Sequence, residues 1–191
     1  MAEACTLLSE GEVLQLVHMY NLEVREEEYL GIIHRKTAAL IAASCKVGAY
    51  LGDAQPGHLG ALHHFGVQVG YAFQLVDDAL DYAGDEGRTG KEVCKDLREG
   101  NITLPLIRVF SQASPAERER LREIVVRSET VAPGALADVL GMMDKYKAVP
   151  YTLDRARGYV EAGKDALSVL PDSTHVDALR ALADYVVDRD A

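Results

Sequence analysis

Apolar residues recur at intervals of three and four positions along most of this chain, and no segment shows the strict alternation typical of a half-buried strand. This periodicity predicts helices separated by short turns, and therefore an all-α fold. The first helix is expected to be interrupted or weakened near its middle, around Ser9, Gly11 and Glu12, and residues such as Thr152 and Ser173 are suitable helix starts. The expected helices span residues 3–19, 25–51, 57–82, 103–113, 115–128, 133–147, 152–170 and 173–189.

The helix expected at 57–82 is the central element of the chain. Four glycines lie along it, and glycines are costly on an exposed helix but allow a neighbouring helix or a ligand to approach closely. They are Gly57, Gly60, Gly66 and Gly70. Three histidines on the same helix show no metal-binding spacing, so we interpret them as packing or surface residues. They are His58, His63 and His64.

Three acidic residues, Asp77, Asp78 and Asp81, interrupt the apolar pattern at the end of this helix. Asp77 and Asp81 share one face, Asp78 lies about 100° around, and Gln74 lies one turn earlier, so four oxygen-bearing side chains can converge. Carboxylates this close repel one another unless a cation binds them. Mg²⁺ prefers oxygen ligands of this kind together with phosphate oxygens. The pattern therefore predicts a site for magnesium and a diphosphate.

Basic residues on both sides of the acidic helix are candidates to meet that diphosphate. Lys36 lies in a mostly apolar stripe of the helix expected at 25–51, with Thr37 beside it. A lysine there must either reach water, with its alkyl stem packed, or meet an anion. A polar segment of more than twenty residues follows the acidic helix and contains Lys91 and Lys95. It either folds over a bound diphosphate and excludes water, or is a solvated charge run.

Composition limits the classes of protein to which the chain can belong. Its 191 residues and 48% hydrophobic content suit one domain, or a piece of a larger one, with a real core. The net charge of −10 argues against a nucleic-acid-binding protein. Cys5, Cys45 and Cys94 are far apart in sequence and fit no zinc or redox spacing, and no signal peptide or membrane-spanning apolar run is evident. These features predict a cytoplasmic protein without integral membrane association.

Five motifs, in order, cover the first 105 residues, and together they resemble the trans-isoprenyl (polyprenyl) diphosphate synthase family. They are EGEVLQL at 10–16, HRKTAAL at 34–40, FQLVDDALDY at 73–82, GK at 90–91 and DLREGNITLP at 96–105. The resemblance implies a helical bundle around a deep cavity, in which Mg²⁺ and lysines hold an allylic diphosphate. In this family the diphosphate leaves to give an allylic cation, isopentenyl diphosphate attacks the cation, and a proton is lost.

The resemblance also implies roles for individual residues. Asp77, Asp78 and Asp81 match the family's second aspartate-rich motif, whose acids hold Mg²⁺ against the allylic diphosphate. Lys36 and Lys91 match lysines that contact the same diphosphate. Thr37 and Gln74 match residues that line the reacting carbons and the leaving group, and the neighbouring Phe73 is expected to bind substrate.

One departure from the family pattern affects the interpretation of the whole chain. No first DDxxD motif, and no arginine pair after it, occurs upstream of Lys36, and Asn101 stands where some relatives carry a lysine. We therefore expect residues 1–191 to form the C-terminal portion of a polyprenyl synthase domain, incomplete and without the N-terminal helices. Relatives form homodimers, so the expected partner is a second copy or a complementary synthase chain.

Three hypotheses follow from the missing motif. In the first, the chain is a portion of a synthase whose other helices come from another chain or from upstream sequence. In the second, it is a non-catalytic partner subunit of a heteromeric prenyl diphosphate synthase. In the third, it is a plain helical interaction module that retains the motif by descent. The preserved motifs favour the first.

Overall fold

The computed structural model describes residues 1–83, 94–126 and 133–188, and all regular structure in these ranges is helical. The all-α prediction is confirmed. The elements are α1 (Ala2–His18), α2 (Glu26–Ile33), a π-helical turn η1 (His34–Ala38), α3 (Ala39–Leu51), α4 (Pro56–Ala83), α6 (Lys95–Glu99), α7 (Leu104–Gln112), α8 (Pro115–Val126), α9 (Pro133–Lys145), α10 (Ala148–Ala166), a 3₁₀ turn η3 (Leu167–Val169) and α11 (Thr174–Asp188).

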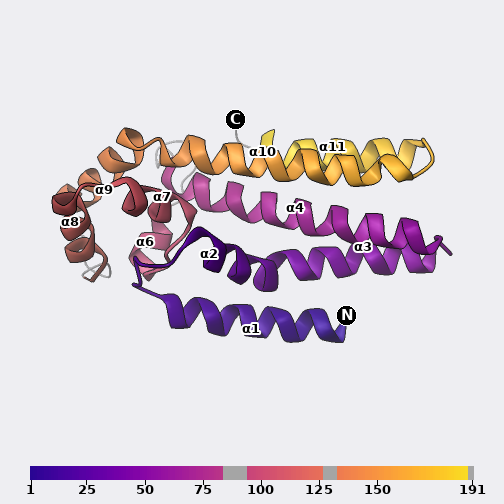
Figure 1. Ribbon diagram of the computed structural model, residues 1–191, viewed down its shortest axis with the longest axis horizontal. Helices are drawn as coiled ribbons and strands as arrows, with labels where there is room; N and C mark the ends of the chain where they lie inside the picture. Colours follow the sequence, from indigo (N-terminus) through magenta and orange to yellow (C-terminus); the bar gives the residue numbers. More distant parts are fainter. Residues whose placement is uncertain (84–93, 127–132, 189–191) are drawn as a thin grey trace.

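The long helices lie in successive layers (Figure 1). α1 forms one edge, α2 and α3 form the next layer, α4 runs through the middle, and α10 with α11 covers its other side. The shorter helices α6, α7, α8 and α9 gather at the end of the molecule where α4 ends. The acidic residues at the end of α4 therefore lie between the layered helices and this helical cluster.

Two apolar cores hold these parts together. The first lies along α4, where Phe65 and Leu75 are buried against Tyr29 of α2 and Val160 of α10. The second lies within the cluster of short helices, around side chains such as Leu97, and includes Tyr82 of α4. Burying a side chain of this size contributes about 1.5–3 kcal/mol, so both cores fix the end of α4 in position.

Two of the four glycines on α4 permit close helix packing, as the sequence predicted. A Cβ atom at Gly66 would lie 2.6 Å from Cα of Ala42, and one at Gly70 would lie 2.5 Å from Cα of Ala38. No neighbouring helix packs closely at Gly57 or Gly60, where a Cβ atom would meet nothing within 4 Å. Close packing thus occurs beside the π-helical turn and not at the start of α4.

The helix expected at 25–51 is helical throughout, but its turn from His34 to Ala38 is π-helical. A π-helical turn contains an extra residue, and such turns often occur at functional sites. α1 packs closely on this turn, because a Cβ atom at Gly11 would lie 2.5 Å from the backbone nitrogen of Lys36. α1 is unbroken, so the expected interruption near Gly11 was wrong, and Gly11 instead serves this close contact.

Helix starts in the second half of the chain were predicted with mixed success. The Ser173 hydroxyl accepts the Val176 N–H at 3.3 Å, which agrees with the expected cap of α11. The expected start at Thr152 was wrong, because α10 begins at Ala148 and the buried Thr152 hydroxyl donates to the Ala148 carbonyl at 2.9 Å. The polar segment after α4 contains the short helix α6, and its residues 84–93 lie outside the described residues.

Candidate functional site

Asp78 is a buried acid near the end of α4. The hydroxyl of Tyr29, on α2, donates to Asp78 Oδ2, and Gln74 Nε2 donates to Asp78 Oδ1 at 2.8 Å. Burial is the main reason that the pKa of Asp78 rises to about 8, and the nearby Asp96 carboxylate adds to the rise. The two hydrogen bonds act in the opposite direction.

Thr37 extends this contact to the π-helical turn. Its hydroxyl donates to Gln74 Oε1 at 2.8 Å, which leaves the Gln74 amide nitrogen facing Asp78. A hydrogen-bonded chain therefore runs from Thr37 through Gln74 and Asp78 to Tyr29, and it joins η1, α4 and α2. The structure brings three of the predicted site residues together in this chain.

Asp81 connects the end of α4 to α6. Its Oδ1 accepts the backbone N–H of Lys95 at 2.9 Å, and its Oδ2 accepts that of Asp96 at 3.0 Å. Burial raises the pKa of Asp81, although these backbone hydrogen bonds oppose the rise. The pKa of Asp96 rises to about 6, first because of burial and then because of the Asp81 carboxylate. Acidic groups are thus crowded where α4 meets α6.

Lys36 points toward α1, where it meets both an amide and an acid. Its Nζ donates to Gln15 Oε1 at 2.8 Å and lies 3.4 Å from Glu12 Oε1, with 29% of the side chain exposed. Gln15 Nε2 donates to Asn101 Oδ1 at 2.8 Å, and Asn101 Nδ2 donates to Asp96 Oδ1 at 3.3 Å. A polar network therefore links Lys36 to the acidic cluster.

The donor chemistry at the end of α4 suits a hard cation in part. Carboxylates with raised pKa values are the acids that a divalent ion stabilises in their ionised form. The oxygens of Asp78, however, contact Tyr29 and Gln74, and within the described residues no three His, Cys, Asp or Glu side chains are arranged to hold a metal ion. The assignment of Asp77, Asp78 and Asp81 as magnesium ligands stays a prediction.

Two further residues, Phe73 and Lys91, were predicted to contact substrate. Phe73 lies one residue before Gln74 on α4, and the residue is 38% exposed. Lys91 lies outside the described residues. Their predicted contacts with substrate stay predictions.

Sequence reasoning missed two residues that organise this site. Tyr29 falls in the apolar stripe of the helix expected at 25–51, a position that predicts only packing, yet its hydroxyl contacts Asp78. Gln15 lay within a recognised motif, but nothing in its local pattern indicated a contact with Lys36. A buried tyrosine needs a partner for its hydroxyl, and this requirement was the available signal for Tyr29.

The fold and the site together define an all-α protein with a cluster of acids at the end of its central helix. The sequence model described as polyprenyl synthetase matches residues 1–143. The chain belongs to this family, and the resemblance inferred from the five motifs is confirmed.

Three relatives illustrate the similarity. The short chain isoprenyl diphosphate synthase of Methanothermobacter thermautotrophicus is 36% identical over 190 residues, which cover 100% of this chain and 58% of the relative. The crystal structure of a decaprenyl diphosphate synthase from Rhodobacter capsulatus matches with a TM-score of 0.92 and 37% identity. A polyprenyl synthase from Caulobacter crescentus CB15, complexed with calcium and isoprenyl diphosphate, gives the same two values.

These comparisons also show how much of a relative the chain represents. Each of the two solved structures matches 100% of this chain, but only 58% of its own chain is covered. The chain therefore corresponds to a little more than half the length of these relatives. Within the described residues, no helix is long and apolar enough to cross a lipid bilayer.

Proposed function

We propose that this chain forms part of a polyprenyl diphosphate synthase that joins an allylic diphosphate head-to-tail to isopentenyl diphosphate with the help of Mg²⁺. The observation that carries the proposal is the hydrogen-bonded chain of Thr37, Gln74 and Asp78 beside the crowded acids Asp81 and Asp96. The Caulobacter crescentus relative, whose structure contains calcium and isoprenyl diphosphate, supports the same pairing of a divalent cation with an isoprenyl diphosphate.

The residues of this chain would act mainly through positioning and electrostatics. Asp77 and Asp81 are the side chains that would hold Mg²⁺, which supplies positive charge to the departing diphosphate. Lys36 and Lys91 would bind the same diphosphate. The oxygens of Thr37 and Gln74 are dipoles fixed in advance by their mutual hydrogen bond, and they would favour the positive charge that develops on the allylic carbons.

Asp78 has a different proposed role, because it is buried and its oxygens contact the Tyr29 and Gln74 side chains, whereas Asp81 is only partly buried. It would hold the Gln74 amide so that Oε1 remains with Thr37 at the substrate. Phe73, which is partly exposed beside Gln74, would contact the apolar chain of the allylic substrate. In this arrangement Phe73 and Gln74, which are consecutive residues of α4, would meet the apolar chain and the reacting carbons of the substrate.

A binding experiment tests the proposed site. Titration of the 191-residue chain with inorganic pyrophosphate, followed by calorimetry with and without Mg²⁺, is expected to show binding only when Mg²⁺ is present. Lys36→Ala should weaken this binding about tenfold or more, since charge-assisted contacts contribute about 1.5–3 kcal/mol. Lys46→Ala, at an exposed position on α3, is the matched control and should bind like the wild type. Binding that ignores Mg²⁺ or Lys36 would contradict the proposal.

Condensation is proposed to need residues beyond these 191, because the first DDxxD motif is missing from them. The chain alone, supplied with an allylic diphosphate, isopentenyl diphosphate and Mg²⁺, should form no product. Addition of the complementary N-terminal portion of a relative should restore product formation. Full activity of the chain alone would refute this part of the proposal.

The missing motif also favours a second candidate, a non-catalytic subunit that binds a complete synthase. The two candidates differ in what the acids do for the assembled enzyme. The triple substitution of Asp77, Asp78 and Asp81 by Ala would leave the turnover of a complete partner intact if the chain is non-catalytic. A collapse of turnover would support the first candidate.

A further inference from the structure

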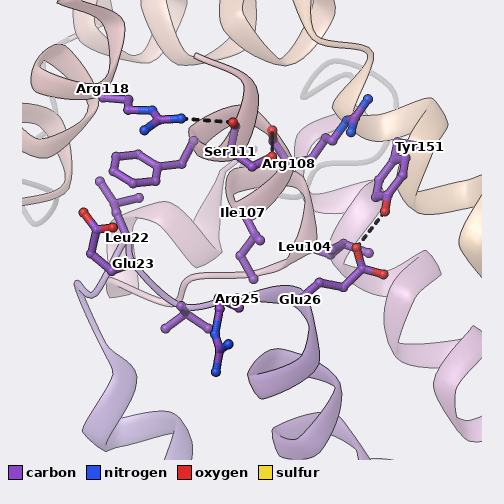
Figure 2. A pocket seen from close by; sticks show the side chains of 12 residues that line it. Leu22, Glu23, Arg25, Glu26, Leu104, Ile107, Arg108, Ser111, Arg118 and Tyr151 are labelled. Carbon is purple, nitrogen blue, oxygen red and sulfur yellow. Dashed lines mark hydrogen bonds between the residues drawn. The ribbon is translucent and has the colours of Figure 1, made fainter. Parts of the chain in front are cut away.

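A cavity of about 310 Å³ lies away from the aspartates, between the segment that precedes α2 and helices α7, α8 and α10 (Figure 2). None of the predicted site residues among the described ones lines it. Its volume is at the lower end of the range for small-molecule sites. The cavity therefore suits a small ligand whose body is about the size of a benzene ring.

One part of the cavity wall is apolar. Leu22 and Val24 contribute from the segment before α2, and Leu104, Ile107 and Phe110 contribute from α7. Apolar surface of this kind favours the hydrocarbon part of a ligand, because contact removes both surfaces from water.

Arg108 supplies a positive charge at the edge of the cavity. Its guanidinium lies 4.4 Å from the centre of the Tyr151 ring, and Figure 2 shows the two side chains next to each other. The Nε atom is buried and has no hydrogen-bond acceptor. Within the described residues, the Arg108 guanidinium donates no hydrogen bond, although it has five N–H groups. A buried donor without an acceptor often marks a position for an ion or water.

The other charged side chains that line the cavity already have partners. Glu26 accepts hydrogen bonds from Tyr151 at 2.6 Å and from the Arg155 side chain at 2.8 Å. Glu23 accepts one from Arg122 at 2.9 Å, and Arg118 donates to the Ser111 carbonyl at 3.0 Å. The Nε atom of Arg118 is also buried without an acceptor, and the Arg25 side chain donates to Glu28. Arg108 is therefore the lining cation whose guanidinium donates no hydrogen bond within the described residues.

We propose that this cavity binds a small organic monocarboxylate, with its carboxylate on Arg108 and its apolar body against Leu104 and Ile107. A guanidinium matches a carboxylate through two parallel hydrogen bonds, and stacking on Tyr151 fixes the plane of the Arg108 fork. The carboxylates of Glu23 and Glu26 also line the cavity, and they disfavour ligands with more than one negative charge. The site does not depend on the function proposed for the aspartates.

Three probes of known chemistry separate the contributions of charge and apolar surface in the 191-residue chain. Benzoate carries both, benzyl alcohol carries only the apolar body, and inorganic phosphate carries only the charge. Binding is followed by amide chemical shifts of residues 22–26 and 104–111 in solution NMR. Benzoate is expected to bind with a dissociation constant of about 1 mM, and the other two probes about tenfold or more weakly. Equal binding of benzyl alcohol, or no benzoate binding, would overturn the proposal.

Substitutions at Arg108 give a second, independent test. Arg108→Gln should weaken benzoate binding about tenfold or more, because the charge-assisted hydrogen bonds are lost. Arg108→Lys keeps the charge but not the planar fork, so it should bind with intermediate affinity and serves if the glutamine variant fails to fold. Arg157→Gln, which removes an exposed arginine of α10 paired with Asp154, is the control and should bind like the wild type. Unchanged benzoate affinity in both Arg108 variants would exclude this site.

Discussion

Asp78 is the acidic residue whose surroundings differ most from those expected for a simple metal ligand. It is buried on α4, and both of its oxygens receive hydrogen bonds, from Tyr29 and from Gln74. A buried acid with two donors couples the positions of the side chains that provide them. The orientation of Gln74, and through it that of Thr37, therefore depends on Asp78 and Tyr29.

Replacing Tyr29 with phenylalanine tests this coupling. Tyr29→Phe removes the donor but keeps the ring, so the buried Asp78 carboxyl loses one of its hydrogen bonds. We expect the free energy of unfolding to fall by about 1–3 kcal/mol in denaturant titrations. Tyr185→Phe, at an exposed position on α11, should change it by less than about 0.5 kcal/mol. Equal stability of the two variants would show that the hydroxyl of Tyr29 contributes nothing to Asp78.

At this scale, the sequence predicted the residues with motif spacing and missed the partners that are distant in the chain. Thr37, Gln74 and Asp78 were predicted, and they do lie together. The contact of Tyr29 with Asp78 spans 49 residues, and that of Gln15 with Asn101 spans 86. Such contacts depend on how helices pack, and periodicity within one helix carries no information about packing between helices.

At the scale of elements, the packing of α1 on the π-helical turn η1 determines where Lys36 lies. Gly11 permits this packing, since a Cβ atom there would meet the backbone of Lys36. The sequence indicated a helix across 25–51, but no residue in it signals a π-helical turn, because the same side chains are compatible with an ordinary α-helix. The sequence therefore indicated Lys36 as a candidate site residue, but it could not predict that Lys36 lies against α1.

Gly11→Ala is expected to push α1 away from η1. The substituted Cβ atom would lie 2.5 Å from the Lys36 nitrogen, and overpacking of this kind costs about 1–3 kcal/mol of the free energy of unfolding. Gly141→Ala on α9 is the matched control, because its Cβ atom would meet nothing within 4 Å. The control should be neutral or more stable by up to about 1 kcal/mol, since alanine favours a helix. Thermal and denaturant unfolding measure both, and a stable Gly11→Ala variant would contradict this packing.

Glu117 links α8 to α9 and gives this pair of helices a dependence on pH. It accepts hydrogen bonds from Lys145 at 2.7 Å and from the Tyr146 hydroxyl at 2.7 Å, and it also caps α8 with Ser114. These contacts, with that of Lys145 the largest, lower its pKa to about 2 from a usual value of 4.5. The ionised form is thus favoured in the folded protein.

The sign of the expected pH effect follows from this lowered pKa. Because the pKa of Glu117 is lower in the folded chain than in the unfolded chain, ionised Glu117 stabilises the fold fully above pH 4.5. This contribution to the free energy of unfolding is lost as pH falls toward about 2. Unfolding of the wild type and of Glu117→Gln, measured from pH 7 to pH 2, should differ most at neutral pH and converge in acid. Glu161→Gln, at an exposed position on α10, is the control. A constant difference between wild type and Glu117→Gln would contradict the role of Glu117 ionisation.

At the scale of the whole molecule, the outer face of α1 exposes apolar side chains that a partner could cover. Val13, Leu16 and Val17 are 58%, 65% and 69% exposed, and their spacing places them on one face of the helix. Contiguous apolar surface of this kind usually marks an interaction site. We expect the 191-residue chain to associate through this face, either with a second copy or with a complementary synthase chain.

Light scattering coupled to size exclusion tests this association without assuming the identity of the partner. The chain alone should have the mass of a dimer, and Leu16→Glu should shift it toward a monomer, because an interface that buries apolar side chains strongly disfavours an unpaired charge. Val169→Glu, which places the same charge at a 60% exposed position on η3, should leave the dimer intact. If the wild-type chain is a stable monomer, the partner of this face should be a complementary synthase chain. In that case Leu16→Glu should prevent the complementary N-terminal portion from restoring product formation. If neither self-association nor restored activity depends on Leu16, the face is not an interface.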